Sequence, residues 1–203
     1  VRINQLGYLP QSIKVAVFIS EEPVNLSKFQ LIDAKTGKKV KTIKNVQSTG
    51  KYGTMNSTYR LNFTEFEKSG EYYIKAGDAK SPVFPINTSV YDGTADFLLN
   101  YMRQQRCGYN PHIQDSCHTH DGYILYHPTK TGQHIDVTGG WHDATDYLQY
   151  TTTSANAIYQ MMFAYQQNPE AFGDEYDANG HKGANGIPDI IDEIKWGLDW
   201  LNK

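Results

Sequence analysis

Short strand-like segments separated by turn residues fill positions 1 to about 90, and this pattern restricts how the chain can begin to fold. Each segment carries β-branched or aromatic residues, several of them in alternation with polar ones. Glycines mark the turns between them. About seven strands at this spacing, in under a hundred residues, predict a β-sandwich of the immunoglobulin type over residues 1–89. The segments expected as strands are Lys14–Ile19, Phe29–Ile32, Lys39–Ile43, Ser57–Phe63 and Glu71–Lys75.

The pattern changes to helical spacing after Ser89. We expect helices over Thr94–Arg106, over Ala144–Gln167 and from about Pro188 to the end of the chain. Three helices joined by long loops cannot enclose a core by themselves. Residues 90–203 are therefore expected to pack on further helices or on a partner. The apolar side chains that make this helical pattern, and are available for burial, are Phe97, Leu98, Tyr101, Met102, Tyr147, Leu148, Ile158, Met161, Met162, Tyr165, Ile187, Ile190, Ile191, Ile194, Leu198 and Leu201.

Charge and hydropathy exclude two classes of function. The formal net charge of −3 gives no basic field for nucleic acid. No apolar stretch approaches the roughly 20 residues that a membrane helix needs, so we expect no membrane insertion. The 15 tyrosines would suit stacking on carbohydrate, although tyrosine is equally common in ordinary cores and surfaces.

Two aspartates in the stretch Asp136–Tyr147 are candidates for catalysis. Asp143 and Asp146 follow a Gly-Gly turn, three positions apart. If Asp143 opens the second helix, both carboxylates project from its first turn, where free backbone N–H groups favour anions. A pair of neighbouring carboxylates can orient and deprotonate a water molecule. The same spacing also fits a capping arrangement, with Asp143 as N-cap, and the spacing alone leaves both interpretations open.

The two cysteines have two interpretations as well. Cys107 and Cys117 could form a disulfide across a short loop. Together with His118 and His142 they also make a two-cysteine, two-histidine set, which is the ligand complement of a structural zinc, and His120 is a substitute ligand.

Acidic residues also gather near the third helix. The oxygen-rich segment Asp174–Gly186 resembles a calcium loop but lacks the glutamate of an EF-hand, so it is interpreted mainly as a turn-forming loop. Asp189, Asp192 and Glu193 are expected to favour the start of the third helix. Trp196 and Trp200 are expected in the core.

Four motifs carry a resemblance to a known family. They are Val1–Pro10, Gln105–Gly108 with Cys117-His118, Asp136–Asp146, and Asn185–Trp196. In this order and spacing they resemble glycoside hydrolase family 9, the cellulase family, in enzymes with an N-terminal immunoglobulin-like domain. The resemblance implies a multidomain chain, in which an all-β sandwich precedes the first helices of an all-α (α/α)6 barrel.

The resemblance also implies an activity: inverting hydrolysis of β-1,4-glucosidic bonds in cellulose or related β-glucan polysaccharides and oligosaccharides. Asp146 would be the general base and Asp143 its partner in holding the water. Trp141, beside them, would line the sugar cleft. Zinc would bind through Cys107, Cys117, His118 and His142 and pin the loop over 108–140, and calcium is a second cofactor found in the family.

Two departures from the family pattern are evident. Thr145 replaces the glycine usual between the two aspartates. The general acid of the family is a glutamate far toward the C-terminus, so the rest of the barrel is expected beyond Lys203. The chain by itself is therefore predicted to be inactive.

The chain begins in strand-like sequence, which is typical of a processed or trimmed protein, and the resemblance implies a secreted, periplasmic or cell-surface location. The alternatives are a non-catalytic carbohydrate-binding or scaffold module, and an exo-acting glycosidase on the same fold.

Overall fold

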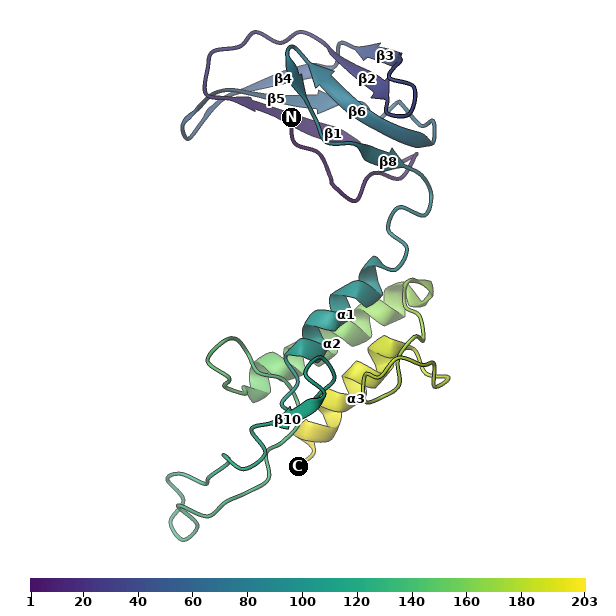
Figure 1. Cartoon of the computed structure of the whole chain (residues 1–203). Coiled ribbons are helices and arrows are strands. Elements are labelled where there is room, and N and C mark those ends of the chain that lie inside the picture. The colour runs from purple at the N-terminus through teal and green to yellow at the C-terminus, as the bar shows by residue number, and fades with distance from the viewer. The chain divides into compact units, whose positions relative to one another are not determined.

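The computed structural model describes all 203 residues, which divide into two compact units, Val1–Tyr91 and Asp92–Lys203 (Figure 1). The first unit is built of strands and the second mainly of helices. The division falls two residues after the domain boundary predicted from the change in sequence pattern.

The first unit is a sandwich of two antiparallel sheets (Figure 1). One sheet has the order β1-β5-β4, and the other has the order β3-β2-β6-β7 with β8 also paired to β6. The strands are β1 (Val15–Ser20), β2 (Phe29–Asp33), β3 (Lys39–Ile43), β4 (Val46–Tyr52), β5 (Met55–Asn62), β6 (Gly70–Ala76), β7 (Ala79–Lys80) and β8 (Phe84–Ile86).

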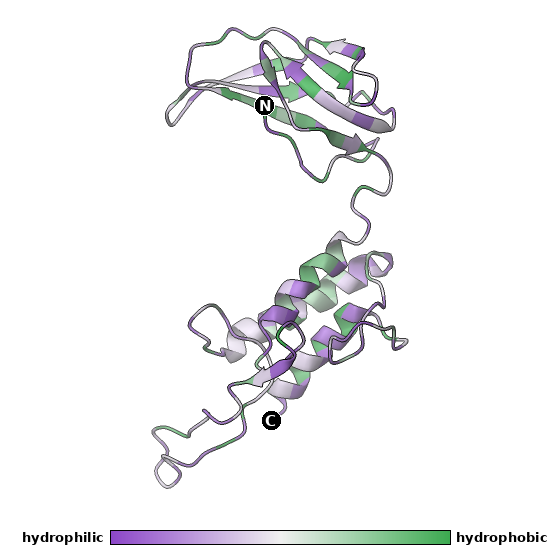
Figure 2. Cartoon of the chain, in the orientation of Figure 1, coloured by the Kyte–Doolittle hydropathy of each residue, from purple (hydrophilic) through white to green (hydrophobic).

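Side chains from both sheets form the core of the sandwich, and hydrophobic and hydrophilic residues are interspersed along its strands (Figure 2). Leu31 of β2 pairs with Ile74 of β6 across the strands, and neither side chain is exposed. Tyr8, Phe63 and Phe84 fill the centre with edge-to-face and tilted ring contacts. Burial of such side chains stabilises a fold by roughly 1.5–3 kcal/mol each before opposing costs.

Strands β4, β7 and β8 were absent from the sequence-based prediction. In β4, every residue after Val46 is exposed, so no hydrophobic alternation marks it. Its register shifts between Ser48 and Gly50, as in a bulge. β8 contains Pro85, a residue that usually argues against a strand.

The second unit packs three helices together. They are α1 (Thr94–Gln104), α2 (Thr151–Gln167) and α3 (Asp189–Leu201), with a short hairpin of β9 (Gly108–Asn110) and β10 (Asp115–Cys117) and a 3-10 turn η1 (Pro169–Ala171). α3 packs against both α1 and α2. None of these helices combines the length and the apolar character needed to cross a membrane.

The core of the helical unit is small. Leu99, Ile158, Ile190 and Ile194 are buried, together with Trp141 from the loop before α2. Several apolar side chains of the predicted helical pattern are exposed, as expected for helices that do not enclose a core by themselves: Phe97, Leu98 and Tyr101 on α1, Met162 on α2, and Ile187, Leu198, Tyr147 and Leu148. On α1 the face that packs inward carries Leu99 and Arg103, because two carboxylates of α3 compensate the buried arginine.

The predicted start of the second helix was wrong. α2 begins at Thr151, seven residues after Ala144, and its N-cap is Tyr150 in an extended conformation. Tyr147 has φ 58°, a left-handed conformation that cannot continue into a right-handed helix. Asp143 and Asp146 therefore lie in a loop and not in a first helical turn.

Candidate functional site

Backbone pairing fixes the loop that carries the two aspartates. The amide of His142 donates to the Gln105 carbonyl at 2.8 Å, and Cys107 exchanges hydrogen bonds with Gly139 and Gly140. Gly140 has φ 62°, and a Cβ atom there would lie 2.6 Å from the Trp200 ring. The Gly-Gly turn is thus required both for its left-handed backbone and for the close approach of α3.

Trp141 lies beneath this loop and belongs to the core. It is 4% exposed, and its Nε1 donates a 2.7 Å hydrogen bond to Oε1 of Glu193 on α3. A Cβ atom on Gly197 would lie 2.2 Å from its ring, which shows how closely α3 approaches. The protein covers most of this ring, and the predicted role of Trp141 in lining a sugar cleft stays a prediction. The ring edge still lines a hollow next to Asp143.

A buried ionic network surrounds Glu193. Arg106 binds both carboxylate oxygens of Glu193, at 3.2 Å through Nε and 2.7 Å through Nη2. Arg103 pairs with Asp189 at 3.3 Å. Asp189 and Glu193, predicted only to favour a helix start, instead neutralise two buried guanidinium groups. Arg106 also stacks over the Trp196 ring at 4.4 Å, as is favourable for a desolvated cation.

Asp143 and Asp146 are both exposed at the surface of this supported loop. The Asp143 amide donates to the Leu148 carbonyl at 2.7 Å, and Oδ1 of Asp146 accepts from the Leu148 amide at 3.1 Å. The Asp143 carboxylate has neither a hydrogen bond nor an ion pair to another residue of the chain, which leaves its oxygens available to a water molecule or a ligand.

A hollow of about 140 Å³ opens beside Asp143. α1 and α2 supply its other walls, and its lining is Tyr101, Met102, Gln105, Trp141, His142, Asp143, Thr153, Ser154 and Ala157. Asp146 does not line it. Of the two predicted carboxylates, the structure places one at the hollow and the other three residues away on the exposed rim of the same loop.

Thr145 occupies its position without left-handed strain. The non-glycine residues with positive φ are Gln114, His118, Tyr126 and Tyr147, and Thr145 is not among them. A threonine between the two aspartates is thus compatible with this loop conformation.

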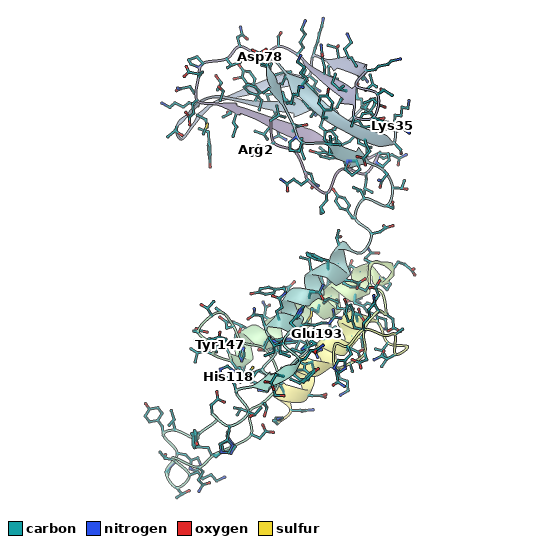
Figure 3. The ribbon with its side chains drawn as sticks, in the orientation of Figure 1. Arg2, Lys35, Asp78, His118, Tyr147 and Glu193 are labelled. Carbon is teal, nitrogen blue, oxygen red and sulfur yellow. The ribbon has the colours of Figure 1, made fainter.

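Three of the four predicted zinc ligands meet in space. The sulfur of Cys117 and ring nitrogens of His118 and His142 all lie within 4.8 Å of one another; His118 is labelled in Figure 3. Nδ1 of His118 and Nε2 of His142 are buried and have no hydrogen-bond partner. Buried polar atoms are normally satisfied, so two unsatisfied imidazole nitrogens facing a free thiol fit a metal ion. Burial is the main cause that lowers the pKa of His142, and the neighbouring His118 lowers it further. The lowered pKa favours the neutral form of the ring, which is the form that binds a metal.

Cys107, the fourth predicted ligand, lies outside this group of three. It is buried, and its sulfur is 4.0 Å from the His118 carbonyl oxygen. Burial raises the pKa of its thiol. Both cysteines are free thiols in the structure, although Cys117 pairs with Gly108, the residue next to Cys107. His120, the substitute ligand, stacks on His134 instead.

Tyr147 covers the two histidines and was not predicted as part of the site. Its ring stacks on His118 at 5.1 Å and meets His142 edge-on at 5.2 Å. Tyr147 and His118 both have left-handed backbones, with φ 58° and 51°. Strained backbone of this kind collects at functional sites when the surrounding structure holds it in place. No sequence pattern marks such a conformation for tyrosine or histidine.

Carboxylates in the loop Asp174–Gly186 are occupied by backbone amides. Asp174 accepts from Asn185 and Gly186, and Asp177 accepts from Asn179 and His181. Asp189 accepts from Glu175 and Tyr176. These bonds agree with the interpretation of the segment as a turn-forming loop.

Two tryptophans of α3 anchor the loop from the other side. Trp196 donates to the Gly140 carbonyl at 2.9 Å, and Trp200 donates to the Val137 carbonyl at 3.0 Å. Both are only partly buried, so they act as polar anchors as well as core residues.

Comparison with known proteins finds two matching family models. Residues 91–203 match the model described as glycosyl hydrolase family 9, and residues 1–81 match the cellulase N-terminal Ig-like domain.

Relatives match the chain along nearly its whole length. Endoglucanase D of Acetivibrio thermocellus is 29% identical over 99% of this chain and 32% of its own. The xyloglucan-specific endo-beta-1,4-glucanase BoGH9A of Bacteroides ovatus is 29% identical over 99% of this chain and 35% of its own. The chain thus spans about a third of the length of these curated relatives.

Solved structures match the fold as well. A metagenome-derived glycoside hydrolase family 9 endoglucanase superimposes with a TM-score of 0.79 at 32% identity, over 98% of this chain and 39% of that one. A second structure, described as a Zn-binding triple mutant of GH family 9 endoglucanase J30, superimposes with a TM-score of 0.78 at 29% identity. The match covers 95% of this chain and 38% of that one. The predicted fold, an immunoglobulin-like sandwich followed by the first helices of a barrel, is confirmed.

Proposed function

Because this chain belongs to glycoside hydrolase family 9, we propose that the complete protein is an inverting hydrolase of β-1,4-glucosidic bonds in β-glucans. Two of its relatives are named for endoglucanase activities, one on xyloglucan. The observation that carries the proposal is the placement of Asp143 and Asp146. Both carboxylates are exposed on one loop that is paired through its backbone and anchored by α3, and Asp143 lines a hollow.

In the proposed reaction, Asp146 is the general base. It takes a proton from a water molecule while the water oxygen attacks the anomeric carbon from the face opposite the leaving group. Asp143, whose carboxylate has no partner within the chain, accepts the second hydrogen bond of that water and fixes its direction. The glycosidic carbon–oxygen bond breaks, and the leaving oxygen takes a proton from an acid on the other face.

That acid is proposed to lie outside these 203 residues. In inverting enzymes the two carboxyl groups stand roughly 6.5–9.5 Å apart to leave room for water, on opposite sides of the sugar. Asp143 and Asp146 share one loop and so supply only one side. We expect the remaining helices of the barrel to provide the acid and to cover Phe97 and Leu98. The 203-residue chain is accordingly proposed to be inactive alone.

A structural zinc is proposed at Cys117, His118 and His142, with Cys107 as the fourth ligand after a local change of its side chain. The unsatisfied buried nitrogens of both histidines support this assignment. When bound, the metal neutralises the thiolates and ties β10 to the loop before α2. His142 immediately precedes Asp143, so the ligand set also fixes the backbone that carries the catalytic pair.

The complete protein is proposed to act outside the cytoplasm, secreted, periplasmic or on the cell surface, because a β-glucan polymer does not cross a membrane. A calcium ion is not assigned to Asp174–Gly186, where the carboxylates of Asp174 and Asp177 already accept hydrogen bonds from backbone amides.

The test uses the complete protein on a soluble β-1,4-glucan, with proton NMR of the first products. We expect new reducing ends with the α-anomer formed first, since inversion of a β-bond produces it. A first product in the β-form would contradict inversion. Release of short units from chain ends alone would favour an exo-acting enzyme, and binding without new reducing ends would favour a carbohydrate-binding module.

A further inference from the structure

Charge is divided unequally between the two units of the chain. Residues 1–91 carry 13 lysines and arginines against 7 acidic residues, whereas residues 92–203 carry 6 against 15. The net charge of −3 thus conceals a sandwich of +6 and a helical unit of −9. Every ion pair in the structure lies in the helical unit, so the cations of the sandwich have no acidic partners within 4 Å.

Five of the unpaired lysines lie on one hairpin, from the turn after β2 through β3 to the residue before Asn45. We call Lys35, Lys38, Lys39, Lys41 and Lys44 the lysine face, and all five side chains are exposed (Figure 3 labels Lys35). Asp33 is the only acidic residue between Phe29 and Asn45, and Thr36 already donates two hydrogen bonds to its carboxylate. The face is therefore a concentrated positive surface.

Protection of a sheet edge explains part of this face. β3 is the edge strand of its sheet, and lysines on edges prevent pairing with other chains. Lys41 fits that role because it is a charged residue of the edge strand, paired with the fully buried Leu31 of β2. Lys35, Lys38 and Lys44 lie outside β3, where no unpaired strand edge needs protection.

A hollow of about 260 Å³ adjoins the end of the lysine face. Lys41 and Lys44 line it together with Thr42 and Asn45, whose side chains form no hydrogen bond within the chain, and one carboxylate, Glu65, is also present. Cations beside free hydroxyl and amide groups match a ligand that offers carboxylates and sugar hydroxyls together.

We propose that the lysine face and its hollow bind a carboxylate-bearing polysaccharide, a polyuronate. The lysines of the face are separate point charges on flexible side chains, which suits carboxylates that are spaced along a polymer. Nucleic acid carries a much denser charge, and its phosphates do not need the neutral hydroxyl and amide groups that line the hollow. A polyuronate carries a single carboxylate per ring among several hydroxyls. This binding is independent of the proposed hydrolysis, so either can fail without the other.

The test measures binding of the 203-residue chain to immobilised polygalacturonate by biolayer interferometry, at about 20 mM and about 200 mM salt, where screening differs strongly. The variant Lys39→Gln, Lys41→Gln, Lys44→Gln is compared with a control, Lys51→Gln, Lys80→Gln, Lys130→Gln, which has the same net charge. We expect binding at low salt, at least about tenfold weaker binding by the first variant, and a change within about twofold for the control. Thermal unfolding confirms that both variants fold.

Four results would overturn the proposal. The first is no binding to polygalacturonate, and the second is equal weakening in both variants, which would indicate net charge alone. The third is equally tight binding of double-stranded DNA at the same salt, which would indicate unspecific adhesion to polyanions. The fourth is self-association of the chain at low salt, measured by sedimentation velocity, without any binding of polysaccharide. That result would indicate that the lysine face binds the acidic helical unit of a second copy.

Discussion

The indole nitrogen of Trp141 lies 2.7 Å from Oε1 of Glu193, and this hydrogen bond joins the loop of the two aspartates to α3. Arg106 binds the same carboxylate, so one buried glutamate holds both the loop and the end of α1. The orientation of Asp143, two residues after Trp141, therefore depends on a side chain 50 positions further along the chain.

Removing the Glu193 carboxylate should lower the stability of the helical unit strongly. We expect Glu193→Ala to cost about 3–5 kcal/mol, because it leaves Arg106 buried without its counter-charge. Glu193→Gln should cost less, since an amide oxygen can still accept from Trp141. All three tryptophans lie in this unit, so urea unfolding followed by fluorescence reports on it. The exposed Glu170→Ala serves as control, and equal midpoints for Glu193→Ala and the control would contradict the expectation.

A methyl group at Gly197 should also destabilise the helical unit, although helix propensity alone would favour alanine at this position. Alanine is favoured over glycine inside a helix by about 1 kcal/mol. However, the new Cβ would lie 2.2 Å from the Trp141 ring, and overpacking typically costs about 1–3 kcal/mol. We expect a net loss of stability in Gly197→Ala, measured by the same urea unfolding. Lys195→Ala, on the exposed side of α3, should change little, and a stabilised Gly197→Ala would refute the close packing.

Zinc should be present in stoichiometric amount and should stabilise the helical unit. A ligand that binds only the folded state raises stability, by roughly 4 kcal/mol at a thousandfold excess over its dissociation constant. We expect a strong chelator, or either of the changes Cys117→Ser and His142→Ala, to remove the metal and lower the unfolding temperature. His127→Ala, in an exposed loop, should retain zinc by elemental analysis. Metal-free protein with Cys107 and Cys117 oxidised to each other would show that the disulfide interpretation is correct.

Replacing Asp192 with a neutral residue should change the stability of the helical unit by an amount that depends on pH. Burial raises the pKa of this carboxyl, and Asp189 and Asp174 add to the effect although Asn185 donates a hydrogen bond to it. The ionised form is thus disfavoured by folding, and the penalty disappears as pH falls through the raised pKa. We expect Asp192→Asn to be more stable than the parent at pH 7, and this advantage to shrink toward about pH 4. An advantage in unfolding midpoint that stays constant between pH 7 and about pH 4 would contradict this.

Much of the sandwich was predictable because its strands follow the rule of alternation. In β6 the buried Tyr72, Ile74 and Ala76 alternate with the less buried Tyr73 and Lys75, and the predicted segments agree with β2 and β6. The start of α2 was not predictable from the same kind of rule. Asp143 followed by Asp146 has the spacing of a helix cap, but the left-handed Tyr147 and its ring contacts with two histidines hold the segment as a loop.

The candidate site was predictable in part for a related reason. Cys117, His118 and His142 were recognisable as ligand types and meet in space. The role of Glu193 was hidden, because an acidic residue early in a helix ordinarily interacts with the helix dipole and solvent. Its partner Arg106 is 87 positions away, and no local pattern indicates such a pairing. The packing of Trp141 against α3 could not be predicted, because proximity in sequence to Asp143 says nothing about which way the ring points.

The most direct test of the proposed chemistry is the initial rate of β-glucan hydrolysis by Asp146→Asn in the complete protein. Loss of a general base should reduce the rate by roughly 10²–10⁴-fold, while binding of the glucan is retained. Asp199→Asn, an exposed aspartate on α3, provides the matched control and should keep the parent rate. If Asp146→Asn hydrolyses the glucan as fast as the parent does, Asp146 is not the base and the proposed mechanism is wrong.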